Sequence, residues 1–319
     1  MKIKKILNYK LNIDTLCFKI DCTLLPIHYE KWETKNVRYI QTRRTIYTDR
    51  GSSGISIRYY KIDKRLSIWI DSVTEALYGS SQRMFDSMDF PVLLQETANV
   101  VNDITGLSAN DRFHEHSFDK ALLTRIDVNH DFYFTEKRYE IKFREWFRKF
   151  NTPYGQKVLY PTGGKYTTHS LNLTYYSKDE QCAQKHKNFI NDISDFCTRV
   201  EFQFKSGFFN RKKNKTLLLD FIYDEQIRYD IAQMILKRLR MDGELLNNGK
   251  YYRFLKKVKN EPHRRDFILN VCKFFKSLNK KGFAEAKNEY NSTFYNYLKL
   301  ANKYNVVPIK LDDDVYREL

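Results

Sequence analysis

The stretch SLNLTYYSK, residues 170–178, has the alternating pattern of a β-strand with one apolar and one polar side. Successive side chains of a strand point to opposite faces of the sheet. One face carries Leu171, Leu173 and Tyr175, and the other carries Asn172, Thr174, Tyr176 and Lys178. The pattern therefore predicts a half-buried strand whose polar face ends in a tyrosine and a lysine.

Two other stretches, RIDVNHDF (125–132) and TRVEFQFKS (198–206), repeat this alternation. Their polar sides carry Arg125, Asp127, Asn129 and Asp131 in the first, and Arg199, Glu201, Gln203 and Lys205 in the second. If the three strands share one sheet, their polar faces combine into one surface. The alternative is an ordinary solvated face of an antiparallel sheet, where such residues are common. Alternation alone leaves both interpretations open.

The combined polar residues would suit phosphoryl transfer. Asp127 and Glu201 are the oxygen ligands that Mg²⁺ or Mn²⁺ prefers, and such a cation stabilises charge that develops on a phosphodiester. The Tyr176 oxygen could attack phosphorus and form a covalent intermediate. Because the pKa of a free tyrosine is near 10, Lys178 is expected to lower it or to neutralise the phosphate.

The neighbouring tyrosines leave an alternative open. Tyr175 and Tyr176 are adjacent and cannot share a face of a regular strand, so Tyr175, grouped with two leucines, is expected in the core. A bulge would exchange the two. Tyr160 and Tyr166 flank a predicted turn at residues 163–164 and are interpreted as packing or DNA-stacking residues.

The rest of the chain predicts an α+β fold with a mainly antiparallel sheet, flanking helices and a helical C-terminal region. Strands are expected at 15–25, in hairpins over 43–72, and at 121–134, 158–178 and 196–207, and helices at 90–107, 136–150 and 179–192. From these we expect a catalytic domain over residues 1–210, with a β-rich part at 1–90, and a basic helical region over 211–319.

Composition favours a polyanionic partner. The 319 residues include 56 Lys and Arg against 39 Asp and Glu, a formal charge of +17, which attracts nucleic acid; a biased, lysine-rich composition is the alternative. The five cysteines form no CxxC pair and indicate free thiols in a reducing compartment. No apolar run approaches the length that spans a bilayer, and no signal peptide is expected. These features indicate a soluble, cytoplasmic protein without a membrane partner.

The helix predicted over 136–150 has a basic face, and Trp146 on it could stack on a base. The alternative is a solvated basic helix that uses its aromatic residues in the core. Together with the polar strands, this helix supplies the residues expected to contact DNA, which are Arg125, Asn172, Arg199, Lys205, Lys142 and Arg148.

The order of three short motifs resembles that of rolling-circle replication initiators. Arg125-Ile126-Asp127, Tyr176-Ser177-Lys178 and Arg199-Val200-Glu201 match the R-I-D, Y-x-K and R-x-E elements of filamentous-phage gene II proteins and related plasmid initiators. The similarity covers roughly residues 65–210. It implies a metal-dependent endonuclease that nicks one strand of single-stranded or supercoiled origin DNA, stays linked to the 5′ phosphate, and later rejoins the strand.

The resemblance also implies roles for single residues. Tyr176 would be the nucleophile, Asp127 and Glu201 would bind Mg²⁺ or Mn²⁺, and Lys178 would support the phosphate. Host replication proteins are further candidate partners. Many initiators of the wider superfamily carry a metal-binding His–hydrophobe–His motif. This chain has His114-Glu115-His116, in which the central residue is charged. If the metal needs a third ligand, His116 and His169 are the candidates. The alternative function is a non-catalytic DNA- or RNA-binding regulator with a related fold.

Overall fold

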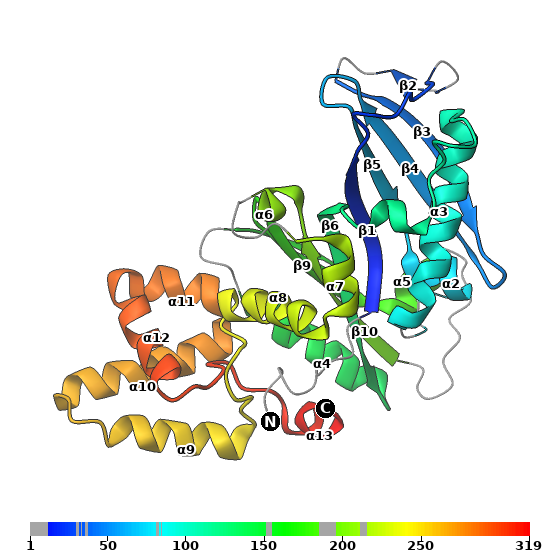
Figure 1. Ribbon diagram of the computed structural model, residues 1–319. Coiled ribbons are helices and arrows are strands. Elements are labelled where there is room, and N and C mark those ends of the chain that lie inside the picture. The colour runs from blue at the N-terminus through cyan, green and yellow to red at the C-terminus, as the bar shows by residue number, and fades with distance from the viewer. Residues whose placement is uncertain are drawn as a thin grey trace.

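A single antiparallel sheet organises the computed structural model (Figure 1). The structure describes residues 12–319 except 30–31, 33, 36–37, 81–82, 84, 151–154, 185–195 and 211–215. Within these residues, ten strands follow the spatial order β2-β3-β4-β5-β1-β6-β10-β9-β8-β7, and the elements after the last strand are helical. The predicted α+β class, with a helical C-terminal region, is confirmed.

The elements have these bounds. The strands are β1 (Asn12–Asp21), β2 (Thr34–Lys35), β3 (Ile40–Tyr47), β4 (Ser52–Tyr60), β5 (Arg65–Ile70), β6 (Leu122–Phe134), β7 (Gln156–Tyr160), β8 (Gly163–Thr167), β9 (Leu171–Ser177) and β10 (Phe196–Phe204). The helices flanking the sheet are α2 (Val73–Tyr78), α3 (Phe90–Thr105), α4 (Lys137–Arg148) and α5 (Lys178–Gln184), with short turns η1 (Ser87–Asp89) and η2 (Glu115–Phe118). The C-terminal helices are α6 (Ser206–Phe209), α7 (Leu218–Tyr223), α8 (Glu225–Arg238), α9 (Asn248–Lys259), α10 (Arg265–Lys281), α11 (Phe283–Tyr290), η4 (Asn291–Thr293), α12 (Phe294–Lys303) and α13 (Asp313–Glu318). The predicted helix over 179–192 is described as far as Gln184, and its remaining residues lie outside the described part.

The three strands singled out by their alternation are consecutive neighbours. Strand β10 pairs with β6 on one side and with β9 on the other, and Arg199 lies opposite both Asp131 and Tyr176. Directly paired residues share a face of the sheet. The polar faces therefore combine into one surface, as the functional interpretation of the three strands required. We call this side the polar face; on β6, β10 and β9 it carries Arg125, Asp127, Asn129, Asp131, Arg199, Glu201, Gln203, Asn172, Thr174 and Tyr176.

The opposite side of the sheet is the apolar core. Helix α4 packs against β6, β8, β9 and β10 on this side, and Tyr175 is buried there with its ring stacked on Phe147, 5.1 Å between centroids. The register of β9 against β10 is continuous through Tyr175 and Tyr176, so no bulge exchanges them. The prediction that Tyr175 belongs to the core is confirmed.

The segment 158–178 forms three strands rather than two, which corrects the predicted turn at Gly163-Gly164. Chain reversal occurs at residues 161–162, and both glycines lie inside β8. A Cβ atom on Gly163 would lie 2.0 Å from the Tyr175 carbonyl oxygen, and one on Gly164 would lie 2.5 Å from the Tyr175 hydroxyl. Glycine is therefore needed here for close packing of β8 on β9, and not for a turn conformation.

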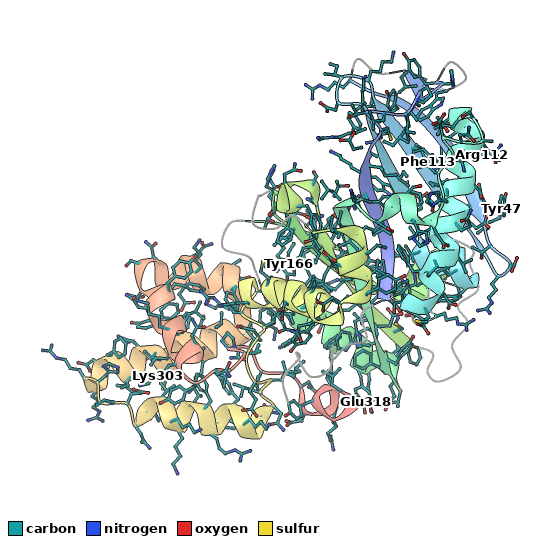
Figure 2. The ribbon with its side chains drawn as sticks, in the orientation of Figure 1. Tyr47, Arg112, Phe113, Tyr166, Lys303 and Glu318 are labelled. Atoms are coloured by element: carbon teal, nitrogen blue, oxygen red, sulfur yellow. The ribbon has the colours of Figure 1, made fainter. Side chains whose placement is uncertain are left out.

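The C-terminal helices dock on the side of α4 that faces away from the sheet. The Trp146 indole donates a hydrogen bond to the Ile309 carbonyl oxygen, 3.0 Å, and the Phe283 amide donates to the Lys149 carbonyl, 2.7 Å. Glu318 of α13 accepts from the Thr135 amide at 3.0 Å (Figure 2). Helix α4 is thus packed between the sheet and the helical region. In the described part of the chain, no helix has the length and apolar character required to cross a membrane.

Candidate active site on the polar face

A tyrosine and a glutamate are joined at the centre of the polar face. Tyr176 of β9 and Glu201 of β10 are on the same side of adjacent strands, and the Tyr176 hydroxyl donates a hydrogen bond to Glu201 Oε1 at 2.5 Å. Both side chains are partly buried. Cross-strand alternation alone brings these two together, because Tyr176 faces Arg199 and Glu201 is two residues further along β10.

The electrostatics of this pair keep the phenol protonated in the resting protein and raise the pKa of the carboxyl group that faces it. Burial, and then the charge of Asp14, raises the pKa of Glu201 to about 7. Burial and the Glu201 carboxylate raise the pKa of Tyr176 well above its ordinary value, while Arg199 acts in the opposite direction. Glu201 is therefore placed and tuned as an acceptor for the phenolic proton.

A buried ion pair lies beside the tyrosine. Arg199 donates to both carboxylate oxygens of Asp131, at 2.6 and 2.7 Å, and only 1% of Arg199 is exposed. Arg199 was predicted to contact DNA, but its guanidinium is held inside the protein by Asp131. Its position next to Tyr176 makes it the cation that favours a phenolate there.

Lys178 lies beside charged residues of the polar face, but not on strand β9 as the alternation rule predicted. Strand β9 ends at Ser177, and Lys178 is the first residue of α5, where its ammonium donates to Gln181 Oε1 at 3.2 Å. Burial, and then Arg199, lowers the pKa of the buried Lys178, while Asp131 raises it. The cation whose charge bears on Tyr176 is therefore Arg199.

Asp127 belongs to a row of polar contacts that crosses β6, β10 and β9. Arg125 donates to both oxygens of Asp127, at 3.0 and 2.7 Å, and Gln203 Nε2 donates to Asp127 Oδ2 at 2.7 Å. The Asn172 amide in turn donates to Gln203. The guanidinium of Arg125 also lies 4.3 Å from the ring centroid of Trp69. Asp127 and Glu201 thus share the face, as predicted, but Asp127 already has a cationic partner.

Two polar residues on this face are additions to the predicted site residues; Asn129 was predicted to be on the face, and Asp14 was not. Asp14 of β1 accepts from the Ser72 hydroxyl at 3.1 Å, and its pKa is raised by burial, against the lowering effect of Arg199. Asn129 is 1% exposed, and neither atom of its side-chain amide has a hydrogen-bond partner. Asn129 lies opposite Glu201 on one side and Asn12 on the other. An unsatisfied buried amide costs free energy, so we expect a water molecule or a ligand to complete its surroundings.

The two candidate histidines lie elsewhere. His116 is exposed on η2, within 3.9 Å of acidic Asp119, and the adjacent Phe118 packs on Phe18 of the apolar side, 5.5 Å between centroids. It is therefore on the opposite side of the sheet from Asp127 and Glu201. The ring of His169 lies against Gly207 beyond the end of β10. The structure brings neither histidine to the carboxylates.

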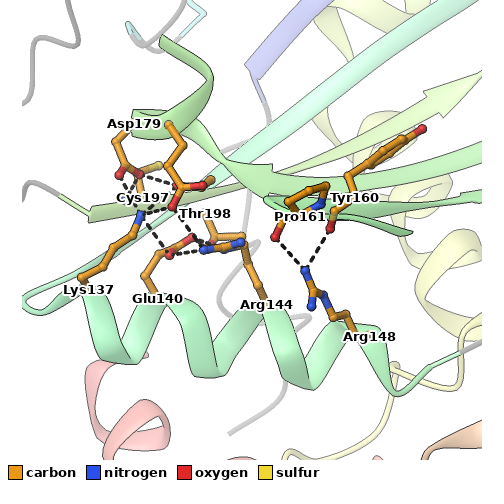
Figure 3. Close-up of polar contacts among 11 residues, drawn as sticks. Lys137, Glu140, Arg144, Arg148, Tyr160, Pro161, Asp179, Cys197 and Thr198 are labelled. Carbon is orange, nitrogen blue, oxygen red and sulfur yellow. Dashed lines mark hydrogen bonds and ion pairs between the residues drawn. The ribbon is translucent and has the colours of Figure 1, made fainter. Parts of the chain in front are cut away.

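Most cations of helix α4 have partners inside the protein (Figure 3). Lys137 pairs with Asp179 and Glu180, both at 2.8 Å, and buried Arg144 pairs with Glu140. The two contacts of Lys137 join α5 to the helix. Trp146 is buried, so the interpretation that places the aromatic residues in the core is the correct one.

The two α4 residues predicted to contact DNA also have protein partners. Lys142 lies 3.2 Å from Asp312. Arg148 donates to the carbonyl oxygens of Tyr160 and Pro161, at 2.9 and 2.8 Å (Figure 3). In these positions Lys142 fixes α13, and Arg148 fixes the turn between β7 and β8.

This turn presents a second tyrosine on the polar face. Tyr160 lies opposite Gly163, which lies opposite Tyr176. All three share one face, and Gly163 has no side chain between the two phenols. Tyr160 is 43% exposed, in contrast to the hydrogen-bonded Tyr176. The polar face therefore carries one enclosed and one accessible phenol in the same row.

Replacing Glu201 with glutamine is expected to remove a pH-dependent loss of stability. The Glu201 pKa rises from 4.5 to about 7 on folding, so between these values the folded chain holds a proton that the unfolded chain releases. The free energy of unfolding must then fall as pH rises through this range, by roughly 3 kcal/mol. Urea denaturation from pH 4.5 to pH 8, in buffer with EDTA, measures this loss in the parent chain.

The matched control is Glu285→Gln, at an exposed glutamate of α11. The difference between the parent and Glu201→Gln profiles should appear between the two pKa values and be absent for Glu285→Gln. Equal profiles for the parent and Glu201→Gln would mean that Glu201 titrates normally in the folded chain.

No family model matches the chain, and no curated protein matches it.

Proposed function

We propose that this protein is a metal-dependent DNA strand transferase, which nicks and rejoins one strand through a phosphotyrosine intermediate and so initiates rolling-circle replication. The hydrogen bond between the Tyr176 phenol and Glu201 carries the proposal, because it places a carboxylate where it can take the proton of the nucleophile. The charge of +17 supports a nucleic-acid substrate.

The reaction transfers one phosphoryl group and balances without a redox partner. Glu201 takes the phenolic proton as the tyrosine oxygen bonds to phosphorus. The bond from phosphorus to the 3′ oxygen breaks, and that oxygen leaves as a 3′ hydroxyl after taking a proton. The 5′ phosphate remains esterified to tyrosine, and attack by a 3′ hydroxyl reverses the step and rejoins the strand. Arg199 beside Tyr176 stabilises negative charge on the phenol oxygen.

The donors on the polar face fit a hard divalent cation. Besides burial, the charge of Asp127 raises the pKa of Asp14, and the charges of Asp14 and Asp127 raise the pKa of Glu201. The three carboxylates therefore repel one another. The side-chain amide of Asn129 lacks a hydrogen-bond partner. These oxygens are the type that Mg²⁺ and Mn²⁺ prefer. Among the described residues, no three His, Cys, Asp or Glu side chains are already grouped closely enough to hold a metal, so these four residues would close around one. The ion would neutralise charge on the scissile phosphate.

Cations border the same face and favour a phosphate backbone. Lys165 of β8 shares the face through its pairing with Thr174. Burial, and then the charges of Lys165 and Arg125, lowers the pKa of Lys205. Three cations close enough to repel one another are stabilised when a polyanion binds between them. Lys205 and Arg125 thus remain predicted DNA contacts.

Tyr176→Phe is expected to abolish covalent linkage to DNA and to leave DNA binding intact. The substrate is a pool of single-stranded oligonucleotides of random sequence labelled at the 3′ end, incubated with Mg²⁺ or Mn²⁺. A 5′ phosphotyrosine keeps the 3′ label on the protein after denaturation in SDS, and sequencing of the captured fragments gives the cleavage site. Peptide mapping of the labelled protein identifies the tyrosine.

Tyr160→Phe is the matched variant, because both phenols are in one row of the polar face. Loss of linkage in Tyr160→Phe, with linkage retained in Tyr176→Phe, would assign the attack to Tyr160 and leave Tyr176 as the residue that holds Glu201. Binding of DNA by the parent chain without linkage in either metal would contradict the proposal and favour a non-catalytic regulator.

A further inference from the structure

A dense set of exposed cations covers the outer side of α9 and the start of α10. We call this the α9 surface; it consists of Arg253, Lys256, Lys257, Lys259, Arg264 and Arg265. Tyr251, Phe254, Leu255 and Val258 bury the opposite side of α9. Figure 1 shows α9 at the edge of the helical region furthest from the sheet.

The cations of the α9 surface lack acidic partners within the described part of the chain. Residues 252–266 include two acidic residues, Glu261 and Asp266. Glu261 is buried and accepts from Lys303 at 2.6 Å and from the Tyr304 hydroxyl, so its charge is already neutralised. Asp266 is exposed in the first turn of α10. Elsewhere on the molecule, by contrast, Lys137, Arg144 and Lys142 have acidic partners.

We propose that the α9 surface binds the phosphate backbone of duplex DNA. Arg253, Lys256 and Lys257 are three and four residues apart and therefore share one helical face. A helix of this width fits a major groove, with phosphates on either side. Proteins that hold single strands use several stacked aromatic rings, whereas Tyr252 is the one large aromatic side chain exposed on this surface, at 67%.

This site is separate from the polar face. The proposal rests on the proposed function, because both assume a nucleic-acid partner. One site would hold the duplex beside the origin while the other acts on the exposed strand. Each cation that contacts a phosphate releases counterions, so removing it must weaken binding and reduce the dependence of binding on salt.

The test is a variant in which Arg253, Lys256, Lys257 and Lys259 are all changed to glutamine. Binding to a duplex of mixed sequence of about 30 base pairs, measured by fluorescence anisotropy, is expected to weaken at least tenfold, and the slope of log K against log salt to fall by about 3. The matched control changes Lys61, Lys64, Arg112 and Lys120 to glutamine, since these exposed cations lie outside the α9 surface and carry the same total charge.

The control is expected to bind the duplex within a few-fold of the parent. Equal losses in the two variants would show a general charge effect and overturn the proposal, as would no loss in either. A loss confined to duplex RNA would overturn it in favour of an RNA partner. The α9 variant is expected to retain covalent linkage to single-stranded oligonucleotides; if the parent chain lacks linkage but the duplex result holds, the strand-transfer function fails and the α9 surface stands.

Discussion

Arg199→Leu is expected to lower the free energy of unfolding by roughly 3–5 kcal/mol, because it leaves Asp131 buried without its cation. Arg199 is 1% exposed and makes two hydrogen bonds to Asp131, whose side chain is 7% exposed. Urea denaturation near pH 7 measures the loss. Binding of oligonucleotides should fall little in the folded fraction, since the guanidinium does not face solvent.

The double variant Arg199→Leu, Asp131→Leu is the control. Replacing both members of a buried ion pair with apolar residues is often close to neutral, so most of the lost stability should return. The double variant would still lack the charge beside Tyr176, and its rate of covalent linkage should stay low. A single variant within about 1 kcal/mol of the parent would mean that water reaches Asp131 and that the pair is not buried.

The main features of the sheet were predictable because alternation is a local property. Residues 125–132, 170–178 and 198–206 each show which side chains share a face, and the structure confirms that these faces combine. The pairing of Tyr176 with Glu201 follows from this. What alternation cannot specify is the order of strands, and so the position of β1 beside β6 was not foreseen.

The missing parts of the candidate site depend on that order. Asp14 joins the polar face from β1, in a stretch where the register between β1 and β6 shifts and the simple period fails. Asn129 was on the predicted face, but its unsatisfied amide is visible only when its neighbours are known. Lys178 begins α5 instead of continuing β9 because the strand ends one residue earlier, a boundary that a pattern of period two does not mark.

The basic helix α4 shows a different limit. Its cations looked available because their partners are remote in sequence: Asp312 for Lys142, and Asp179 for Lys137. A helix packed on two sides buries much of its surface, so its charged groups need partners on the elements that pack against it. The α9 surface differs from α4, since its cations have no acidic partners among the residues that the structure describes.

Trp146→Ala is expected to lower the free energy of unfolding by roughly 3–5 kcal/mol, because the indole is buried and the cavity would not collapse fully. Trp146 is 3% exposed, its ring contacts Phe143 and Phe150, and its N–H donates to the Ile309 carbonyl. Removing it should loosen the helical region from α4. Urea denaturation measures the loss, and limited proteolysis should show faster cleavage after residue 210 than in the parent.

Trp146→Phe separates the two contributions of the indole. It keeps an aromatic ring against Phe143 and Phe150 but leaves the Ile309 carbonyl without its donor, a cost of about 1–3 kcal/mol. A phenylalanine variant as unstable as the alanine variant would show that the hydrogen bond, and not ring packing, joins the two parts. Stability near that of the parent in both variants would mean that the helical region docks independently of α4, and the α9 surface would then be free to move relative to the polar face.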